Sequence, residues 1–150
     1  MNLDTLRSLF ARHASSEAPQ AGPDQELRVA ACALLLEMAH ADQVFTADER
    51  ANIEELLVRH FALTPEGARE LMETAERERR EATDLFQFTS VINQNYDEGQ
   101  RMVLAELLWR VVYADGQLSK HEDYLARKLA SLLELRPGYL AEARKRARPL

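Results

Sequence analysis

The sequence predicts an all-α fold, a compact bundle of seven or eight helices, and three observations support this prediction. No segment alternates apolar and polar residues for long, as a half-buried strand would. Apolar residues instead recur at helical spacing along most of the chain. One short phrase also occurs twice, each time between two helix-like runs, which indicates two related helix–loop–helix hairpins. The two copies are Ala41-Asp42-Gln43-Val44-Phe45-Thr46-Ala47-Asp48-Glu49 and Ala114-Asp115-Gly116-Gln117-Leu118-Ser119-Lys120-His121-Glu122.

Length and composition limit the class of protein. A chain of 150 residues with 46% hydrophobic residues is long enough for one domain with a real core. The net charge of −6 argues against a nucleic-acid partner, because nucleic-acid-binding surfaces are basic. Cys32 is the only cysteine, which excludes a disulfide within the chain and suits a reducing cytoplasm. The sequence lacks a signal peptide and an apolar run long enough to span a bilayer. We therefore expect a cytoplasmic protein that does not span the membrane.

The N-terminal segment, residues 1–23, is predicted to be a short amphipathic helix and a linker. Leu3, Leu6, Leu9 and Phe10 share one helical face, and a small, polar, proline-containing stretch follows. This helix either docks loosely on the rest of the chain or uses its apolar stripe to bind a partner or a second copy, which would give a homodimer. Residues 24–150 form the main predicted domain.

The first half of that domain should contain three helices. A wide apolar stripe over residues 24–40 is typical of a central core helix. Thr46 begins the second helix. Thr64 and Pro65 begin the third, since they provide an N-cap and a proline at the first helical position. The charge-dense end of the third helix, residues 73–81, is interpreted as a solvated face with favourable i,i+4 pairs.

The second half repeats this plan after one additional helix. Thr83 or Asp84 is expected to cap that helix. Residues 98–113 then match the central helix of the first half. Ser119 begins the next helix, and Pro137 separates it from a short last helix that ends in arginine and lysine residues. Cations are favoured at a helix C-terminus by the macrodipole, so this basic end needs no ligand to explain it.

The glutamates of the repeated phrase have a structural explanation. Thr46 and Glu49, like Ser119 and Glu122, have the spacing of a capping box. In that motif the hydroxyl accepts from the backbone N–H three residues on, and the carboxylate accepts from the N-cap backbone. Capping is therefore at least part of what these glutamates are expected to do.

The aspartates of the phrase leave two interpretations open. Asp42 and Asp115 follow the C-terminal ends of two helices, where exposed carbonyl groups disfavour a negative charge. They either shape the loops as Asx-turns or supply negative charge for a cation. Carboxylate and carbonyl oxygens suit Ca²⁺ or Mg²⁺ rather than Zn²⁺. Neither loop is an EF-hand, so a site would need both loops facing each other, with Asp42, Glu49, Asp115 and Glu122 as ligands.

Other chemistry is sparse. The sequence contains no catalytic serine, zinc-protease, phosphate-loop or dinucleotide-binding motif. Glu37 and His40 have the spacing of a di-iron ligand pair, but the matching positions of the second half are Arg110 and Tyr113. We expect a non-enzymatic module that binds a divalent cation. The alternatives are a protein-interaction scaffold whose acids only cap helices and, more remotely, a metal-assisted hydrolase.

The sequence resembles the TerB-like family, which is named for a tellurite-resistance protein. A domain related to this family occurs in membrane-anchored DnaJ-type co-chaperones. The resemblance covers about residues 24–136. It departs from the family pattern at Gln43, where the usual glycine is absent. The segments that carry it are residues 34–42 (LLLEMAHAD) with Glu49, residues 84–88 (DLFQF), residues 108–109 (LW), and residues 113–116 (YADG) with Glu122.

The resemblance implies a compact helical bundle without established enzymatic activity. It also implies an acidic divalent-cation site, which by position would comprise Asp42, Glu49, Asp115 and Glu122. Its functional context would be tellurite or general stress resistance, with protein partners associated with the membrane.

Overall fold

The computed structural model describes residues 23–40, 45–114 and 120–148, with the side chains of residues 23 and 120–122 excepted. These residues form seven helices and no strands, which confirms the all-α prediction. The predicted N-terminal helix lies outside the described residues. The helices are α2 (Pro23–Ala39), α3 (Ala47–Phe61), α4 (Pro65–Glu81), α5 (Phe86–Asn95), α6 (Glu98–Ala114), α7 (Lys120–Leu132) and α8 (Pro137–Ala147).

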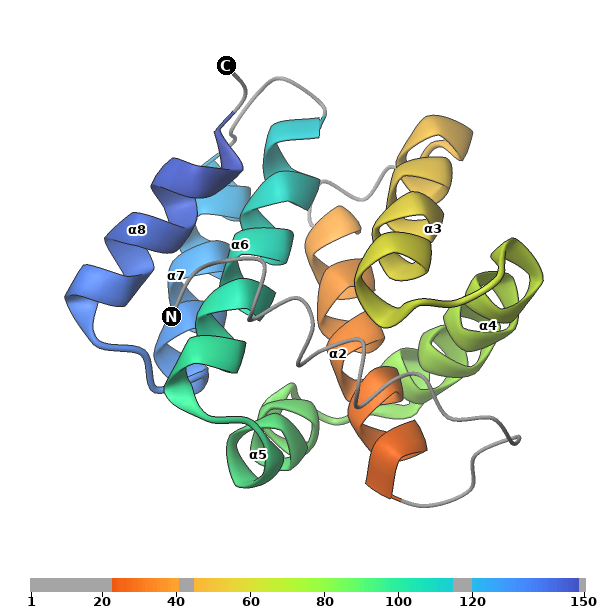
Figure 1. Ribbon diagram of the computed structural model, residues 1–150, viewed down its shortest axis with the longest axis horizontal. Helices are drawn as coiled ribbons and strands as arrows, with labels where there is room; N and C mark the ends of the chain where they lie inside the picture. The colour runs from red at the N-terminus through yellow and green to blue at the C-terminus, as the bar shows by residue number, and fades with distance from the viewer. Residues whose placement is uncertain (1–22, 41–44, 115–119, 149–150) are drawn as a thin grey trace.

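Helix α2 lies at the centre of the bundle and packs against α3, α4, α5, α6 and α7 (Figure 1). It is buried on nearly every side because small and apolar residues run around its whole circumference. Helix α6 is its counterpart and packs against α2, α3, α7 and α8. The fully covered side chains of the two helices include Leu34, Leu35, Met38, Leu104 and Leu107.

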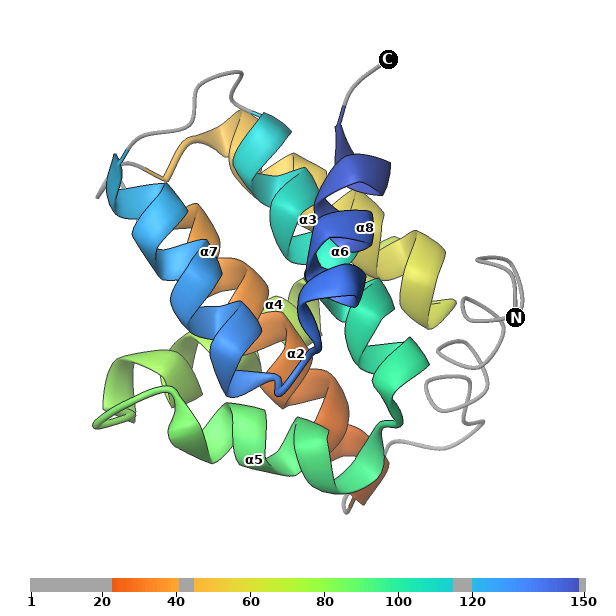
Figure 2. The same cartoon turned by 90° about the vertical axis from the view of Figure 1, so that its left-hand side faces the viewer.

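Helices α2 and α6 run in the same direction, so their C-terminal ends lie at the same end of the bundle (Figures 1 and 2). Helix α5 crosses the opposite end, where both helices begin. The two central helices of the sequence repeat therefore both end on the side of the bundle away from α5.

Local sequence determines where α3 and α4 begin. Glu49 N donates to Thr46 Oγ1 across 3.1 Å, and Thr46 N donates to Glu49 Oε1 across 3.4 Å, which completes the predicted capping box of α3. Helix α4 begins with Pro65, and Gly67 N donates to Thr64 Oγ1 at 2.9 Å. Both starts follow from side chains within three residues of the cap.

The predicted cap of α5 is wrong. Leu85 occupies the N-cap position and makes no capping hydrogen bond through its side chain. Asp84 lies one residue earlier, and its Oδ1 accepts from Phe86 N at 2.9 Å. The aspartate therefore closes an Asx-type turn ahead of the helix, and Leu85 at the cap position packs instead against the core.

Candidate functional site

The predicted cation ligands fall mostly outside the described residues. Asp42 and Asp115 lie there, and so does the side chain of Glu122, although its backbone belongs to α7. Glu49 is described, and its carboxylate completes the capping box of α3. Among the side chains that the structure describes, no three His, Cys, Asp or Glu residues are grouped as a metal site would require.

A partly buried ion-pair network lies where α4 crosses α2. Arg79 is its centre: Nη2 lies 2.8 Å from Glu76 Oε1, and Nη1 lies 2.9 Å from Glu37 Oε2. Arg80 Nε and His40 Nε2 approach Glu76 Oε1 at 3.3 and 3.6 Å. The network joins a carboxylate of α2 to three charged residues of α4.

This network corrects two sequence interpretations. The end of α4 is not simply a solvated face, since the side chains of Glu76 and Arg79 are only 15% and 17% exposed. Glu37 and His40 share a helical face, as a di-iron ligand pair would. Glu37, however, is engaged by Arg79, and His40 lies beside Glu76. Their spacing therefore reflects packing between α2 and α4.

The network changes the protonation of its members. Burial lowers the pKa of His40, and the nearby charge of Arg79 lowers it further, which outweighs the opposite effect of Glu76 and Glu37. The hydrogen bond from Arg79 lowers the pKa of Glu76 despite its burial. At neutral pH the network therefore contains neutral His40 beside an ionised Glu76.

Cys32 is fully buried in α2. Burial raises the pKa of its thiol, and the neighbouring negative charge of Glu76 raises it further. The thiol is therefore protonated and unreactive, and it serves as a small apolar core residue.

Comparison with known proteins identifies the fold family. The model of the family described as "Tellurite resistance protein TerB" matches residues 28–145. The chain belongs to the TerB family. No curated protein matches it. A solved structure, a protein of unknown function, PG1108, from Porphyromonas gingivalis W83, is 20% identical over 90% of this chain and 96% of that one, with a TM-score of 0.62.

The length and polarity of the helices of this TerB domain bear on whether any of them could span a membrane. Within residues 23–40, 45–114 and 120–148, none is long and apolar enough to cross a bilayer.

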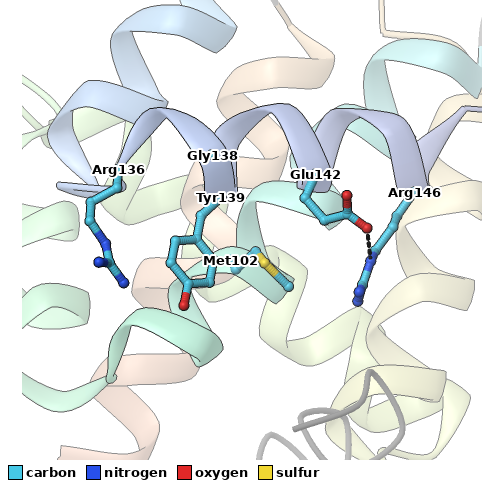
Figure 3. Close-up of a pocket in the computed structure, with 6 residues that line it drawn as sticks. All are labelled: Met102, Arg136, Gly138, Tyr139, Glu142 and Arg146. Carbon is cyan, nitrogen blue, oxygen red and sulfur yellow. Dashed lines mark hydrogen bonds and ion pairs between the residues drawn. The ribbon is translucent and has the colours of Figure 1, made fainter.

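Helix α8 of the TerB domain borders a shallow hollow of 660 Å³ against α6 (Figure 3). Met102 of α6 and Tyr139 of α8 form its apolar floor, while Arg136 and Arg146 flank it. Arg136 lies over the Tyr139 ring at 4.9 Å and donates to Glu98 at 2.6 Å. These contacts tie the start of α8 to the start of α6. Among the described residues that line the hollow, each charged side chain has a partner, since Arg136 pairs with Glu98 and Arg146 pairs with Glu142.

An aromatic and basic cluster, which the sequence alone does not predict, lies on the opposite flank of α8. Arg144 of α8 lies over the Trp109 ring at 4.5 Å, and its Nε donates to the Tyr113 hydroxyl at 3.0 Å. The Trp109 and Tyr113 rings stack with centroids 6.0 Å apart. The i,i+4 spacing of two aromatic residues was available in the sequence, but the arginine comes from a segment about thirty residues away.

Proposed function

We propose that this TerB domain is a non-enzymatic cytoplasmic module whose two acidic loops together bind one divalent cation, Ca²⁺ or Mg²⁺ in preference to Zn²⁺. Asp42, Glu49, Asp115 and Glu122 are the proposed ligands. The observation that supports this proposal is the common direction of α2 and α6, which ends both helices at the same end of the bundle (Figures 1 and 2).

The electrostatics of such a site favour a cation. Two carboxylates about 6 Å apart repel by roughly 3 kcal/mol at an effective dielectric constant of about 20. A helix C-terminus adds to this cost, because its carbonyl groups carry partial negative charge. A bound cation would remove both penalties, and carboxylate and carbonyl oxygens are the ligands that Ca²⁺ and Mg²⁺ prefer.

Calorimetric titration of the full chain with Ca²⁺, Mg²⁺ and Zn²⁺ tests the proposal. Asp42→Asn and Asp115→Asn should each abolish or strongly weaken binding. Asp48→Asn is the matched control, since Asp48 is an exposed acid of the first turn of α3, adjacent to Glu49. Absence of binding heat at millimolar concentrations of all three ions would exclude the cation site.

The second candidate is a scaffold for protein partners at the membrane, in which the loop acids serve only as caps. The capping box at Glu49 fits this alternative, because it gives that carboxylate a structural role that needs no ion. Under this alternative no ion binds. Glu49→Gln then changes the stability of the fold only slightly, because Gln also completes a capping box. A link to tellurite or stress resistance comes from the family, and a deletion strain challenged with tellurite would test it.

A further inference from the structure

A second hollow lies between α3, α6 and α8, with a volume of 560 Å³. Its lining is unusually basic for a chain with a net charge of −6. Four arginines line it, and Glu55 is the only carboxylate among its described lining residues. The arginines come from all three helices or their ends: Arg59, Arg110, Arg146 and Arg148.

Two of these arginines are neutralised by strong partners. Arg110 Nη2 lies 2.9 Å from Glu106 Oε1, and the Glu106 side chain is only 2% exposed. Arg146 Nε donates to Glu142 at 2.9 Å. Both ion pairs involve residues on the same helix, four positions apart. These arginines therefore form the walls of the hollow and offer little free charge.

The other two retain their charge for an incoming group. Arg59 Nη2 lies 3.7 Å from Glu55 Oε1, with both side chains about two-thirds exposed, and such pairs contribute little. No carboxylate among the described residues pairs with Arg148, which lies close enough to the Tyr113 hydroxyl to hydrogen-bond with it. The hollow thus combines two guanidinium groups that have no close carboxylate partner, one on α3 and one directly after α8.

Tyr113 adds a polarised hydroxyl to the same hollow. Its oxygen accepts a hydrogen bond from Arg144 Nε at 3.0 Å, which leaves the hydroxyl hydrogen available as a donor. Burial alone would raise the pKa of Tyr113, but hydrogen bonding and positive charge from Arg144 and Arg148 bring it below its ordinary value. The hydroxyl is therefore a stronger donor than that of an isolated tyrosine.

We propose that this hollow binds an oxyanion, the phosphate or carboxylate group of a small ligand, with Arg59 and Arg148 supplying charge and Tyr113 supplying an O–H donor. The macrodipole explains why arginines collect at the end of α8. It does not explain why an arginine of α3 and a tyrosine of α6 line the same hollow. Two guanidinium groups and a hydroxyl are suited to an oxyanion, because charge-assisted hydrogen bonds to its oxygens are the strongest that proteins make.

A nuclear magnetic resonance titration of the full chain tests the proposal. Inorganic phosphate and citrate are added separately at constant ionic strength, with chloride as the balancing anion. We expect saturable shifts of the Arg59, Arg148 and Tyr113 signals, with a dissociation constant of about 1 mM for the preferred anion. The anion that saturates first identifies the chemical group, phosphate or carboxylate.

Variants separate this site from general attraction of anions to arginines. Arg148→Gln and Arg59→Gln should each weaken binding about tenfold, the equivalent of one charge-assisted hydrogen bond. Tyr113→Phe should weaken it while leaving both charges in place. The matched control is Arg127→Gln, because Arg127 is also exposed and forms an i,i+4 pair, with Asp123.

Two results would overturn the proposal. One is a linear response to both anions that does not saturate. The other is equal weakening by Arg127→Gln and by Arg148→Gln, which would mean that only bulk charge matters. Thermal melting of each variant verifies that it is folded. If an arginine variant fails to fold, Tyr113→Phe still tests the site. Unchanged anion binding by Tyr113→Phe would contradict the proposed hydroxyl donor.

Discussion

The guanidinium of Arg79 on α4 reaches across to Glu37 on α2, with 2.9 Å between Nη1 and Oε2. The same guanidinium donates to both oxygens of Glu76 through Nε and Nη2. One arginine thus binds two carboxylates on two helices. The planar guanidinium has five N–H donors, so it can make both contacts, whereas the single ammonium group of a lysine could not make them in this geometry.

Replacement of Arg79 by Gln should therefore destabilise the fold. The change leaves Glu37 and Glu76 close together, partly buried and without their main partner, which should cost about 1–3 kcal/mol of unfolding free energy. Urea denaturation at neutral pH measures it. Arg80→Gln is the control, since the Arg80 side chain is 71% exposed and its loss should cost less than about 0.5 kcal/mol. Equal effects of the two variants would show that the network contributes nothing beyond surface charge.

The stability of the domain should fall as the solution is made mildly acidic. The pKa of His40 in the folded state lies below its ordinary value of 6.5. His40 is therefore protonated in the unfolded chain at a pH at which it is still neutral in the folded chain. Stability therefore decreases as the pH falls through 6.5 and towards the lower folded pKa. Glu76 adds a loss at lower pH, because its stabilisation is present above 4.5 and disappears as the pH falls through its depressed folded pKa.

His40→Gln isolates the first of these effects. Urea midpoints of the parent chain should fall between about pH 7.5 and pH 5.5, and those of the variant should fall less, because the proton-linked difference at residue 40 is gone. Identical pH dependence in both proteins would contradict a lowered pKa at His40.

Leu35→Ala and Leu108→Ala should each cost about 2–5 kcal/mol, as truncations of buried leucines do. The two residues occupy equivalent places in the central helices and are 0% and 3% exposed. Denaturant melts give the free energies. Tyr124→Ala provides the comparison, because the Tyr124 side chain is 64% exposed and its removal should change stability by less than about 0.5 kcal/mol.

Thr46→Ala should cost about 1 kcal/mol, the usual value of an N-cap hydroxyl. The reason is that Glu49 N loses its acceptor at 3.1 Å. Glu49→Gln should cost much less, since Gln also completes a capping box. Both are measured by thermal melting without divalent ions. A larger loss from Glu49→Gln than from Thr46→Ala would mean that the glutamate does more than cap.

A chain that lacks residues 1–22 should still melt cooperatively. The described core begins at Leu27, and its members pack against one another from α2 onward. Circular dichroism of the truncated chain, compared with the full chain, is the measurement. A broad, non-cooperative transition would place the N-terminal segment in the core.

The parts of the fold that depend on residues near one another in sequence are predictable from the sequence. The starts of α3 and α4 follow from Thr46 and Thr64, because a cap acts over three residues. The central helices were evident because their apolar residues extend around the helix. The α5 start was misplaced because a leucine at the cap position is favoured by core packing and not by any local hydrogen bond.

The sites were harder to predict because they depend on residues distant in sequence. Glu76 with Arg79 looked like surface charge until α2 brought Glu37 alongside. Tyr113 and Arg144 come from different helices and meet only in the folded chain. Of the four proposed cation ligands, the structure describes the side chain of Glu49 alone, and that one as a cap. That the two acidic loops face each other therefore stays a prediction.

The central position of α2 has a consequence for how the chain folds during its synthesis. This helix is made first among the described helices, yet one of the helices that cover it is α7, which ends at Leu132. At a translation rate of about 5–20 residues per second, the end of α7 is synthesised roughly 5–20 s after the end of α2. The apolar surface of α2 that packs against α7 stays uncovered during this time. Until then the nascent chain presents a hydrophobic helix to the ribosome surface and to chaperones, so slow codons between α2 and α7 should lengthen the period in which this protein is prone to aggregate.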